Sequence, residues 1–409
     1  MKNVAVIGAN YGDESKGKTT DYVVKNMLTD GLNPIVIRYS GSNNATHTVY
    51  LNQDNYHAFS SFGSGSYRNA PTYLSSFFIV DPVALAKELH QFKNKFPKYD
   101  DFNATIYIDP KCRFVTPYDV ALNRVKEYVR SSNKHGSTGN GLHECIERQS
   151  THPFHVEDWN NSLAHLEEIQ RYFVDQFNAL QIEYDIVVDR LPAELAHLVT
   201  ICLDPRFAEI FEEKYFLLES IKQIKIGKPD LKQFNCVFEG SQGLALDEDY
   251  PNFPYVTRAK TGVHNILKIC TEFGVELTDV YYLSRCYMSR HGFDPNFNAE
   301  NHQAVLDHFD IVDVTNTHND WQGSMVFDYL DYDGLEQRIT DDYTECREQF
   351  PHCTQHRVFS CVDQLKQGVP FKAWVFGKLE SFPSFEHFHT AYYGNHDIGS
   401  SIQFRSPIN

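Results

Sequence analysis

Residues Gly12–Thr19 (GDESKGKT) place two glycines, two lysines and a threonine in the spacing of a loop that binds nucleotide phosphates. In such a loop, backbone amides and a lysine surround the phosphate oxygens. Asp13 and Glu14 are acidic, although a phosphate-binding loop gains nothing from a negative charge beside the phosphates. Either the match is accidental, or a carboxylate takes part in the reaction.

A phosphate-binding loop of this kind connects a strand to a helix, and the neighbouring segments fit both elements. The apolar run Val4–Gly8 predicts a strand before it, and Thr19–Leu28 predicts a helix after it. Farther along, apolar runs of strand length alternate with longer amphipathic segments, which is typical of a parallel sheet covered by helices. We predict an α/β fold with a large, mainly parallel central sheet, helices on both faces and an N-terminal strand–loop–helix unit of the phosphate-loop kind.

The predicted elements fall within one domain, residues 1–409, with a helical subdomain at about 157–232 where strands are scarce. The predicted strands are NVAVIGA (3–9), NPIVIRYSG (33–41), TYLSSFFIV (72–80), ATIYID (104–109), CVFEGSQG (236–243) and DVYYLSRCY (279–287). The clearest helical segments are 81–96 and 162–184. The aromatic and histidine-rich tail after Glu380 has no clear periodicity, so its structure is not predicted.

Composition limits the partners. The chain carries a formal charge of −17, which argues against duplex nucleic acid. Its nine cysteines include no CxxC pair, which favours reduced thiols over a disulfide framework or a zinc site. No targeting segment and no run of membrane-spanning length is found, so we expect a soluble, cytoplasmic protein without a membrane partner.

A second loop clarifies the first. The stretch Ile37–Thr48 (IRYSGSNNATHT) holds Asn44, Thr46 and His47 among small residues. Together with GDESKGK it resembles the adenylosuccinate synthetase family, whose pattern is roughly WGDEGKGK followed by RYQGGHNAGHT.

Further stretches match the family in the same order. HAFSSFGSGSY and FFIVDPVALAKE are similar to its HLIPSGIL and VVxxPxxLxxE, and HGSTGNG (135–141) is similar to IGTTGRG. FEGSQGLALDEDYPNFPYVT (238–257) is similar to FEGAQGxxLDxDxGTYPFVT, and RCYMSRHG (285–292) to AYTTRVG. Each motif is weak alone, but the ordered series is specific. A kinase-type loop is the alternative, but it explains neither Asp13 nor Lys16, and no strand ends in a convincing second acidic motif.

The resemblance implies a two-step reaction, in which GTP phosphorylates O6 of a purine monophosphate such as IMP and the amino group of aspartate then displaces the phosphate. It implies that Asp13 is the general base that removes the N1 proton, and that His47 and Lys16 stabilise charge during the transfer. Asp13 and Thr46 are the implied ligands of Mg²⁺. A homodimer is also implied, because the family's phosphate-binding arginine comes from the neighbouring subunit.

The remaining site residues are carried over from the family by motif. The implied nucleotide- and phosphate-binding residues are Gly12, Glu14, Ser15, Gly17, Lys18, Thr19, Thr48 and Asp363. The implied purine monophosphate-binding residues are Asn44, Ala45, Thr138, Arg148, Gln242 and Thr257. The residues expected at the amine substrate are Thr315, Thr317, His318 and Arg290.

Two departures from the family concern its substrates. The family's TTGRxRR loop clamps aspartate with arginines, whereas the corresponding stretch Val314–Gly323 (VTNTHNDWQG) contains none. Either the amine has changed, or Arg285, Arg290 or Arg357 acts as the clamp. The family's guanine-reading TKLD is SCVD here, which keeps Asp363 but replaces the lysine by Cys361.

Two further departures are lost glycines, since Ser15 and Thr46 each replace a family glycine. Together these changes indicate a diverged paralogue. The sequence therefore favours a GTP-dependent ligase with aspartate as the default amine. The alternatives are the same activation step with another amine or base, such as a dGMP-type nucleotide, and an inactive nucleotide-binding sensor. Retention of Asp13 argues against the sensor.

Overall fold

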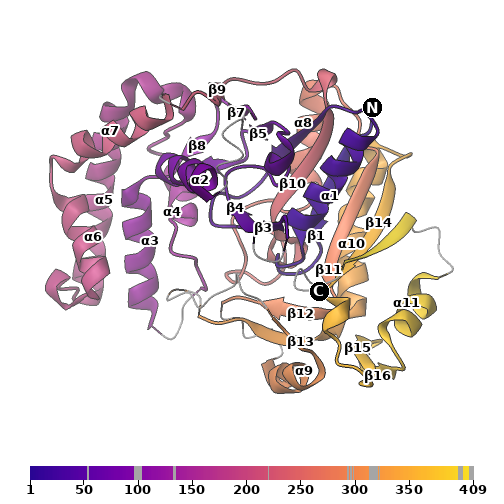
Figure 1. The fold of residues 1–409 in the computed structure, drawn as a ribbon. Coiled ribbons are helices and arrows are strands. Elements are labelled where there is room, and N and C mark those ends of the chain that lie inside the picture. The colour runs from indigo at the N-terminus through magenta and orange to yellow at the C-terminus, as the bar shows by residue number, and fades with distance from the viewer. Residues whose placement is uncertain are drawn as a thin grey trace.

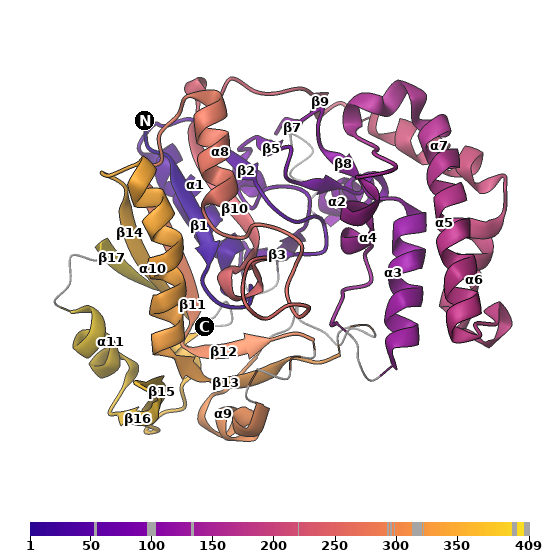
Figure 2. The same cartoon turned by 180° about the vertical axis from the view of Figure 1, so that it is seen from behind.

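The computed structural model describes residues 1–52, 55–95, 104–131, 135–219, 221–292, 294, 297, 299–312, 321, 323–394 and 399–404. Nine strands of these residues form one sheet in the order β17-β14-β11-β1-β10-β2-β5-β7-β9, and every neighbouring pair is parallel (Figures 1 and 2). The predicted α/β fold with a large, mainly parallel sheet is therefore confirmed. The strands are β1 Val4–Gly8, β2 Pro34–Arg38, β5 Thr72–Leu74, β7 Ile106–Ile108, β9 Ile224–Ile226, β10 Asn235–Gly243, β11 Asp279–Arg285, β14 Thr354–Ser360 and β17 Gly399–Phe404.

Strand β1 is apolar on both sides because each of its sides meets a helix layer. Val4 and Val6 join one core with residues of α1, whereas Ala5 and Ile7 join another with residues of α8 and α10. Helix α1 accordingly covers one face of the sheet, and α8 and α10 cover the other (Figures 1 and 2). These helices are α1 Lys16–Thr29, α8 His264–Phe273 and α10 Tyr332–Gln349.

A third core joins the β5 and β7 end of the sheet to the helices beside it. The segment predicted as a helical subdomain supplies α5, α6 and α7, and it then returns to the sheet as the edge strand β9, which the sequence analysis did not predict. The helices of this side are α2 Pro82–Lys95, α3 Pro117–Arg130, α4 Leu142–Arg148, α5 Ser162–Tyr184, α6 Ala193–Leu203 and α7 Phe207–Glu219.

Two predicted strands are in fact divided. TYLSSFFIV forms β5 and the short β6, and DVYYLSRCY forms β11 before the chain enters β12 of a separate four-stranded sheet, β12-β13-β15-β16. The unpredicted tail contains α11 and β17, and β17 extends the main sheet beside β14. The remaining elements are β3 His47–Tyr50, β4 Tyr56–Phe59, β6 Ile79–Val80, β8 Arg113–Phe114, β12 Tyr287–Arg290, α9 His302–His308, β13 Val326–Asp331, β15 Phe371–Val375, β16 Lys378–Phe382 and α11 Phe385–Tyr393.

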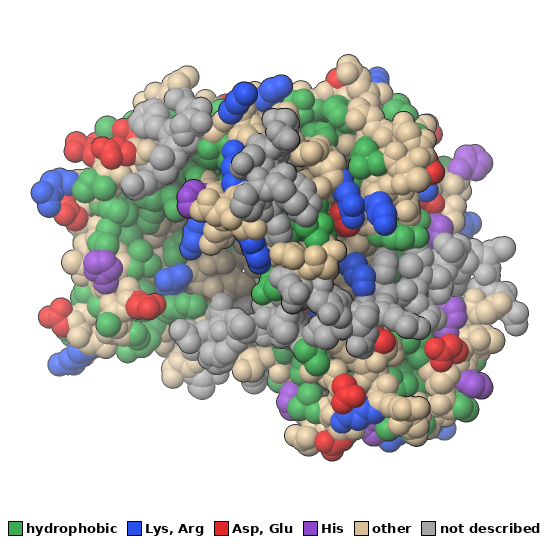
Figure 3. All heavy atoms as spheres, viewed as in Figure 1, with side chains coloured by type: hydrophobic (Ala, Val, Ile, Leu, Met, Phe, Trp, Pro, Cys, Tyr) green, Lys and Arg blue, Asp and Glu red, His purple; other side chains and the backbone are tan. Residues whose placement is uncertain are grey.

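The parallel arrangement gathers the chemical motifs. The motif loops after β1, β2, β10, β11 and β14 all leave the sheet at its carboxyl edge, where α/β proteins bind ligands. Figure 3 shows a hollow near the middle of one face, with Lys and Arg side chains along its edge. Among the described residues, no helix combines the length and the apolar character that crossing a membrane requires.

Candidate active site

The Gly12–Thr19 loop connects β1 to α1 and depends on two backbone positions with positive φ. Gly12 has φ +105° and Ser15 has φ +68°, so the chain turns sharply before α1 begins at Lys16. A helix start of this kind presents free backbone amides, which suits phosphate oxygens. Thr19 is buried and its hydroxyl donates to the carbonyl of Ser15 at 3.1 Å, which fixes the first turn.

The two acidic residues of the loop lie in different environments. Glu14 is 3% exposed, and its carboxylate accepts hydrogen bonds from the amides of Asn10 at 3.1 Å and Gly12 at 3.0 Å. Burial raises the pKa of Glu14. The expectation that Glu14 contacts phosphate does not match this position, because the side chain shapes the loop from inside. The Asp13 side chain, by contrast, is 29% exposed.

Lys16 folds back under the same loop. It is 2% exposed, its ammonium group donates to the carbonyl of Gly12, and burial lowers its pKa against the opposing charges of Glu14 and Asp13. Lys18 is half-buried instead and lies near Asp363 of the SCVD stretch. Burial lowers the pKa of Lys18, and the Asp363 charge opposes this shift. The structure thus brings the guanine-reading candidate next to the phosphate loop.

His47 begins β3 and packs against the first turn of α1. A methyl group at Gly17 would lie 2.9 Å from the His47 Cβ, so the helix and the strand touch closely. The imidazole is buried, its Nδ1 lies 2.7 Å from Oε1 of Glu239, and its Nε2 lies 3.5 Å from the carbonyl of Ser241. Burial lowers the pKa of His47.

The loop before His47 holds the other residues predicted there. The Ser42 hydroxyl donates to the side chain of Asn44 at 3.0 Å. Asn44, Ala45 and Thr48 are half-buried, and Thr46 is exposed.

The end of β10 forms the floor of the phosphate loop. A methyl group at Gly12 would lie 3.2 Å from the Cα of Gln242, and one at Gly243 would lie 2.3 Å from the carbonyl of Asn10. The side-chain oxygen of Gln242 is buried without a hydrogen-bond partner among the described residues. An unpaired buried amide oxygen is costly, so this atom is suited to a ligand donor.

The predicted purine monophosphate residues are only partly brought together. Thr138 and Thr257 are half-buried in two loops that meet where the His135 and Tyr255 rings lie 6.4 Å apart. Arg148 does not join them. It is fully buried and forms a two-point ion pair with Asp119, at 2.7 and 3.0 Å.

The Arg148 guanidinium also donates to the carbonyls of His152, at 3.0 Å, and Phe114, at 2.5 Å. In this chain's own fold the guanidinium is used to hold α4, so the structure gives no support to its prediction as a phosphate ligand.

The amine-substrate residues Thr315, Thr317 and His318 lie outside the described residues. Of the three arginines considered as clamps, Arg357 is bound to Glu336 at 2.7 and 3.0 Å. Arg290 is 3% exposed, and it pairs with Asp294 at 3.2 Å and donates to the carbonyl of Tyr255 at 2.8 Å.

Arg285, the third of these arginines, is 7% exposed. Its Nε donates to the backbone carbonyl of Asp13, and its Nη1 donates to the Tyr287 hydroxyl at 3.1 Å.

Two contributors to the site were missed by the sequence analysis. Glu239 orients His47, and Arg338 of α10 donates to the carbonyl of Ala9 at 3.0 Å and to the side chain of Asn10. Arg285 was considered only as a clamp for the amine substrate, and here it donates to the backbone carbonyl of Asp13. For Glu239, a signal was present: a carboxylate inside a strand that is otherwise buried on both sides needs a partner.

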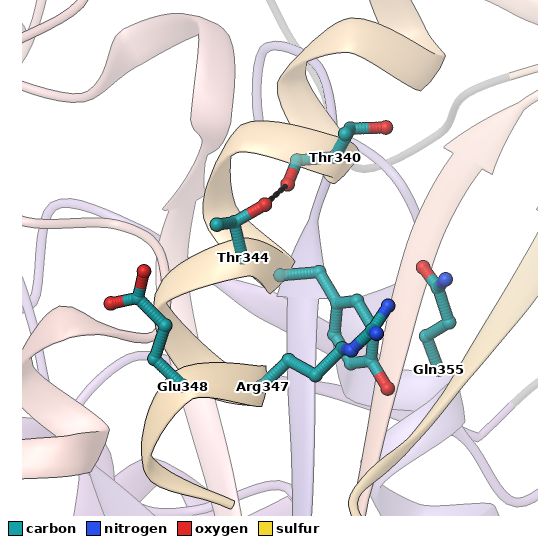
Figure 4. Close-up of a pocket in the computed structure, with 6 residues that line it drawn as sticks. Thr340, Thr344, Arg347, Glu348 and Gln355 are labelled. Carbon is teal, nitrogen blue, oxygen red and sulfur yellow. Dashed lines mark hydrogen bonds between the residues drawn. The ribbon is translucent and has the colours of Figure 1, made fainter. Parts of the chain in front are cut away.

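A cluster of possible metal ligands and a pocket also lie among the described residues, and neither includes a predicted site residue. His143, Glu144 and Glu147 lie within metal-ligand reach of one another, but Lys126 already contacts Glu144 at 2.5 Å and Glu147 at 3.4 Å. A pocket of about 290 Å³ lies between α10 and β14 (Figure 4). It is lined by Thr340, Tyr343, Thr344, Arg347, Glu348 and Gln355.

A protein-family model matches most of the chain, including the loops that form this candidate site. The family model described as adenylosuccinate synthetase matches residues 5–316. The chain belongs to this family. The matched range includes the phosphate loop, His47 and Glu239, so the resemblance predicted from the motifs is confirmed.

Curated members of the synthetase family are distant relatives. The adenylosuccinate synthetase of Francisella philomiragia is 27% identical over 307 residues, and that of Francisella tularensis subsp. tularensis is 26% identical over the same length. Each match covers 72% of this chain and 65% of the relative. The chain therefore spans less than two thirds of the length of these synthetases.

Two solved structures share the fold. A fully ligated adenylosuccinate synthetase from Plasmodium falciparum aligns with a TM-score of 0.59 at 18% identity, covering 93% of this chain and 83% of its own. A succinoaminodeoxyadenylate synthetase of cyanophage S-2L, bound to dGMP and to dATP as an energy donor, aligns with a TM-score of 0.51 at 13% identity. That alignment covers 89% of this chain and 86% of the phage protein.

Proposed function

We propose that this chain is a GTP-dependent ligase that activates a 6-oxopurine monophosphate at O6 and replaces the activated oxygen with an amine. The observation that carries the proposal is the position of Asp13. Its side chain is 29% exposed at the edge of a phosphate loop. The neighbouring Glu14 is buried inside that loop, where its carboxylate accepts hydrogen bonds from two backbone amides. An exposed carboxylate at this place suits a general base, which a protein that merely bound nucleotide would not need.

In the first step, Asp13 removes the N1 proton of the purine, which makes O6 a nucleophile. O6 then attacks the γ-phosphorus, the bond to the bridging oxygen breaks, and GDP leaves. Glu239 holds Nδ1 of His47, and Nε2 makes only a weak 3.5 Å contact with Ser241, so Nε2 is the nitrogen left to stabilise charge at the transferring group. Backbone amides at the start of α1 hold the phosphates.

In the second step, the amine nitrogen bonds to C6, the C6–O bond breaks, inorganic phosphate leaves and one proton is released. Asp13 and the carbonyl of Thr46 would hold Mg²⁺. Both residues are accessible and offer the oxygen ligands that this ion prefers, and when bound it neutralises charge on the phosphates. A homodimer and a cytoplasmic location are part of the proposal.

The test is phosphate release by the purified protein with GTP, Mg²⁺ and IMP, with and without L-aspartate. Aspartate-dependent release with a succinylated purine product supports the proposal with aspartate as the amine. Asp13→Ala should keep nucleotide binding and abolish release. If wild-type protein binds GTP and IMP but no amine or base supports release, the chain is a nucleotide sensor instead.

A second candidate keeps the activation step and changes the amine or the base. It is favoured because Val314–Gly323 contains no arginine, while Arg290 and Arg357 are bound to Asp294 and Glu336. The cyanophage protein of similar fold was solved with dGMP and dATP. The same assay with dGMP in place of IMP, and with ATP or dATP in place of GTP, separates the two candidates.

A further inference from the structure

His291 lies beside the carboxylate of Asp13, at the end of β12. Its Nε2 is 3.6 Å from Oδ2 of Asp13, and the imidazole is 18% exposed. The family pattern AYTTRVG, matched here by RCYMSRHG, has valine at this position. A residue that can donate a hydrogen bond to the proposed base therefore replaces one that cannot.

The backbone on both sides of His291 is fixed. Arg290 forms its ion pair with Asp294 and lies 4.8 Å from the centre of the Tyr11 ring. On the other side, Gly292 has φ +81°, and a methyl group there would lie 3.2 Å from the Cα of Gly136. The imidazole is thus placed by two tightly packed neighbours.

The Asp13 backbone and side chain are held separately. The Nε of Arg285 donates to the backbone carbonyl of Asp13. Among the hydrogen bonds and ion pairs of the described residues, the contact with His291 is the one that reaches this carboxylate.

At 3.6 Å the contact between His291 and Asp13 is longer than a hydrogen bond, but catalytic hydrogen bonds often shorten when substrate binds. Misplacing a catalytic group by about 1 Å can lower a rate about 100-fold.

We propose that His291 is a positioning residue that holds the Asp13 carboxylate toward the purine. This inference rests on the proposed role of Asp13 as the general base.

The kinetic test compares His291→Val, which restores the family residue, with His291→Gln, which keeps a donor. We expect His291→Val to lower kcat for phosphate release about 10- to 100-fold with little change in KM for GTP. His291→Gln should recover most of the loss. The matched control is His264→Val. It removes a 2.7 Å contact between the His264 imidazole on α8 and the Glu345 carboxylate on α10, and it should leave kcat unchanged. Unchanged kcat in His291→Val, or equal losses in both His291 variants, would overturn the inference.

A second measurement does not depend on turnover. Crystal structures of the unliganded wild type and His291→Val should show the Asp13 carboxylate beside the imidazole in the first and in a different rotamer in the second. An identical, well-ordered carboxylate in both would overturn the inference. If wild-type protein releases no phosphate with any purine monophosphate, the proposed function fails, and this comparison still decides whether His291 positions Asp13.

Discussion

His47 and Glu239 form a buried pair, with Nδ1 of the imidazole 2.7 Å from Oε1 of the carboxylate and side-chain exposures of 4% and 0%. Burial alone would raise the pKa of Glu239, but the charge and hydrogen bond of His47, together with Arg38 and Ser64, bring it down to about 2. The carboxylate therefore stays ionised at neutral pH, and it fixes the orientation of the imidazole beside the phosphate loop.

Replacing Glu239 by Gln tests this pair. The change keeps the shape of the side chain but removes its charge, and the amide group then faces the hydrogen-bond donors of Ser64. We expect the free energy of unfolding to fall by about 1–3 kcal/mol and kcat for phosphate release to fall about 10- to 100-fold. Urea denaturation and steady-state kinetics measure the two effects.

Glu88→Gln is the control for this change. Glu88 is 4% exposed and accepts hydrogen bonds from the amides of Ser60 at 3.0 Å and Ser61 at 2.7 Å, but no contact with His47 is found among the described residues. It should lower stability similarly without the loss of kcat. Equal losses of kcat in the two variants would show that the orientation of His47 is not the cause.

Arg148→Met distinguishes the family-based assignment from the observed packing. It leaves the carboxylate of Asp119 buried without its guanidinium partner, and removal of one partner of a buried pair costs about 3–5 kcal/mol. We expect that loss of stability in chemical denaturation, with KM for the purine monophosphate unchanged in the folded protein. A raised KM at unchanged stability would restore Arg148 as a phosphate ligand.

Gly12→Ala tests the shape of the phosphate loop. The backbone there has φ +105°, and the added methyl group would lie 3.2 Å from the Cα of Gln242. We expect stability to fall by about 1–3 kcal/mol and GTP binding, measured by calorimetry, to weaken strongly. Gly31→Ala is the matched control, because Gly31 has φ +73° with no atom within 4 Å of the new methyl group. Equal loss of GTP binding in both variants would contradict this view of the loop.

Arg338→Lys tests whether α10 supports the loop from behind. A lysine keeps the charge but cannot reproduce the fork that reaches both Ala9 and Asn10. We expect weaker GTP binding, of the order of 10-fold, in the same calorimetric measurement. Arg357→Lys, which changes the partner of Glu336 instead, should bind GTP normally. Wild-type affinity in Arg338→Lys would show that the loop keeps its shape without this arginine.

Most strands of the sheet could be predicted from the sequence because each is a short apolar run. Val4–Gly8 is apolar at every position, and such a run fits a strand covered on both sides. The tail was harder to predict. Strand β17 owes its place to pairing with β14, a contact between distant segments that local periodicity cannot reveal.

Candidate site residues could be selected where a motif fixes the residue type, and not where tertiary contacts decide the role. Asp13 and His47 were selected from their loops, and their catalytic roles remain predictions. Arg148 was carried over from the family because it follows the HGSTGNG motif, and its burial beside Asp119 depends on how α4 packs against α3. His291 differs from the family pattern, so the motifs gave no reason to select it before its distance from Asp13 was known.

Asp342 makes the stability of the fold depend on pH. It is a half-buried residue of α10, and its carboxyl group accepts hydrogen bonds from the Tyr282 hydroxyl at 2.7 Å and the Val263 amide at 2.9 Å. Burial raises its pKa from 3.8 to about 7. The folded state therefore binds a proton that the unfolded state has lost between these values, so this group's contribution to stability falls as pH rises from about 4 to 7.

Asp342→Asn removes this titration. Relative to the wild type, the variant should gain stability steadily from pH 4 to 7, by up to about 4 kcal/mol. Urea denaturation of both proteins at several pH values gives the difference in their free energies of unfolding. Groups that titrate in both proteins contribute equally and therefore cancel in this difference. Because the carboxyl group links α10 to the start of α8, a difference that stays constant with pH would mean that Asp342 is ionised throughout this range and acts as a fixed helix cap.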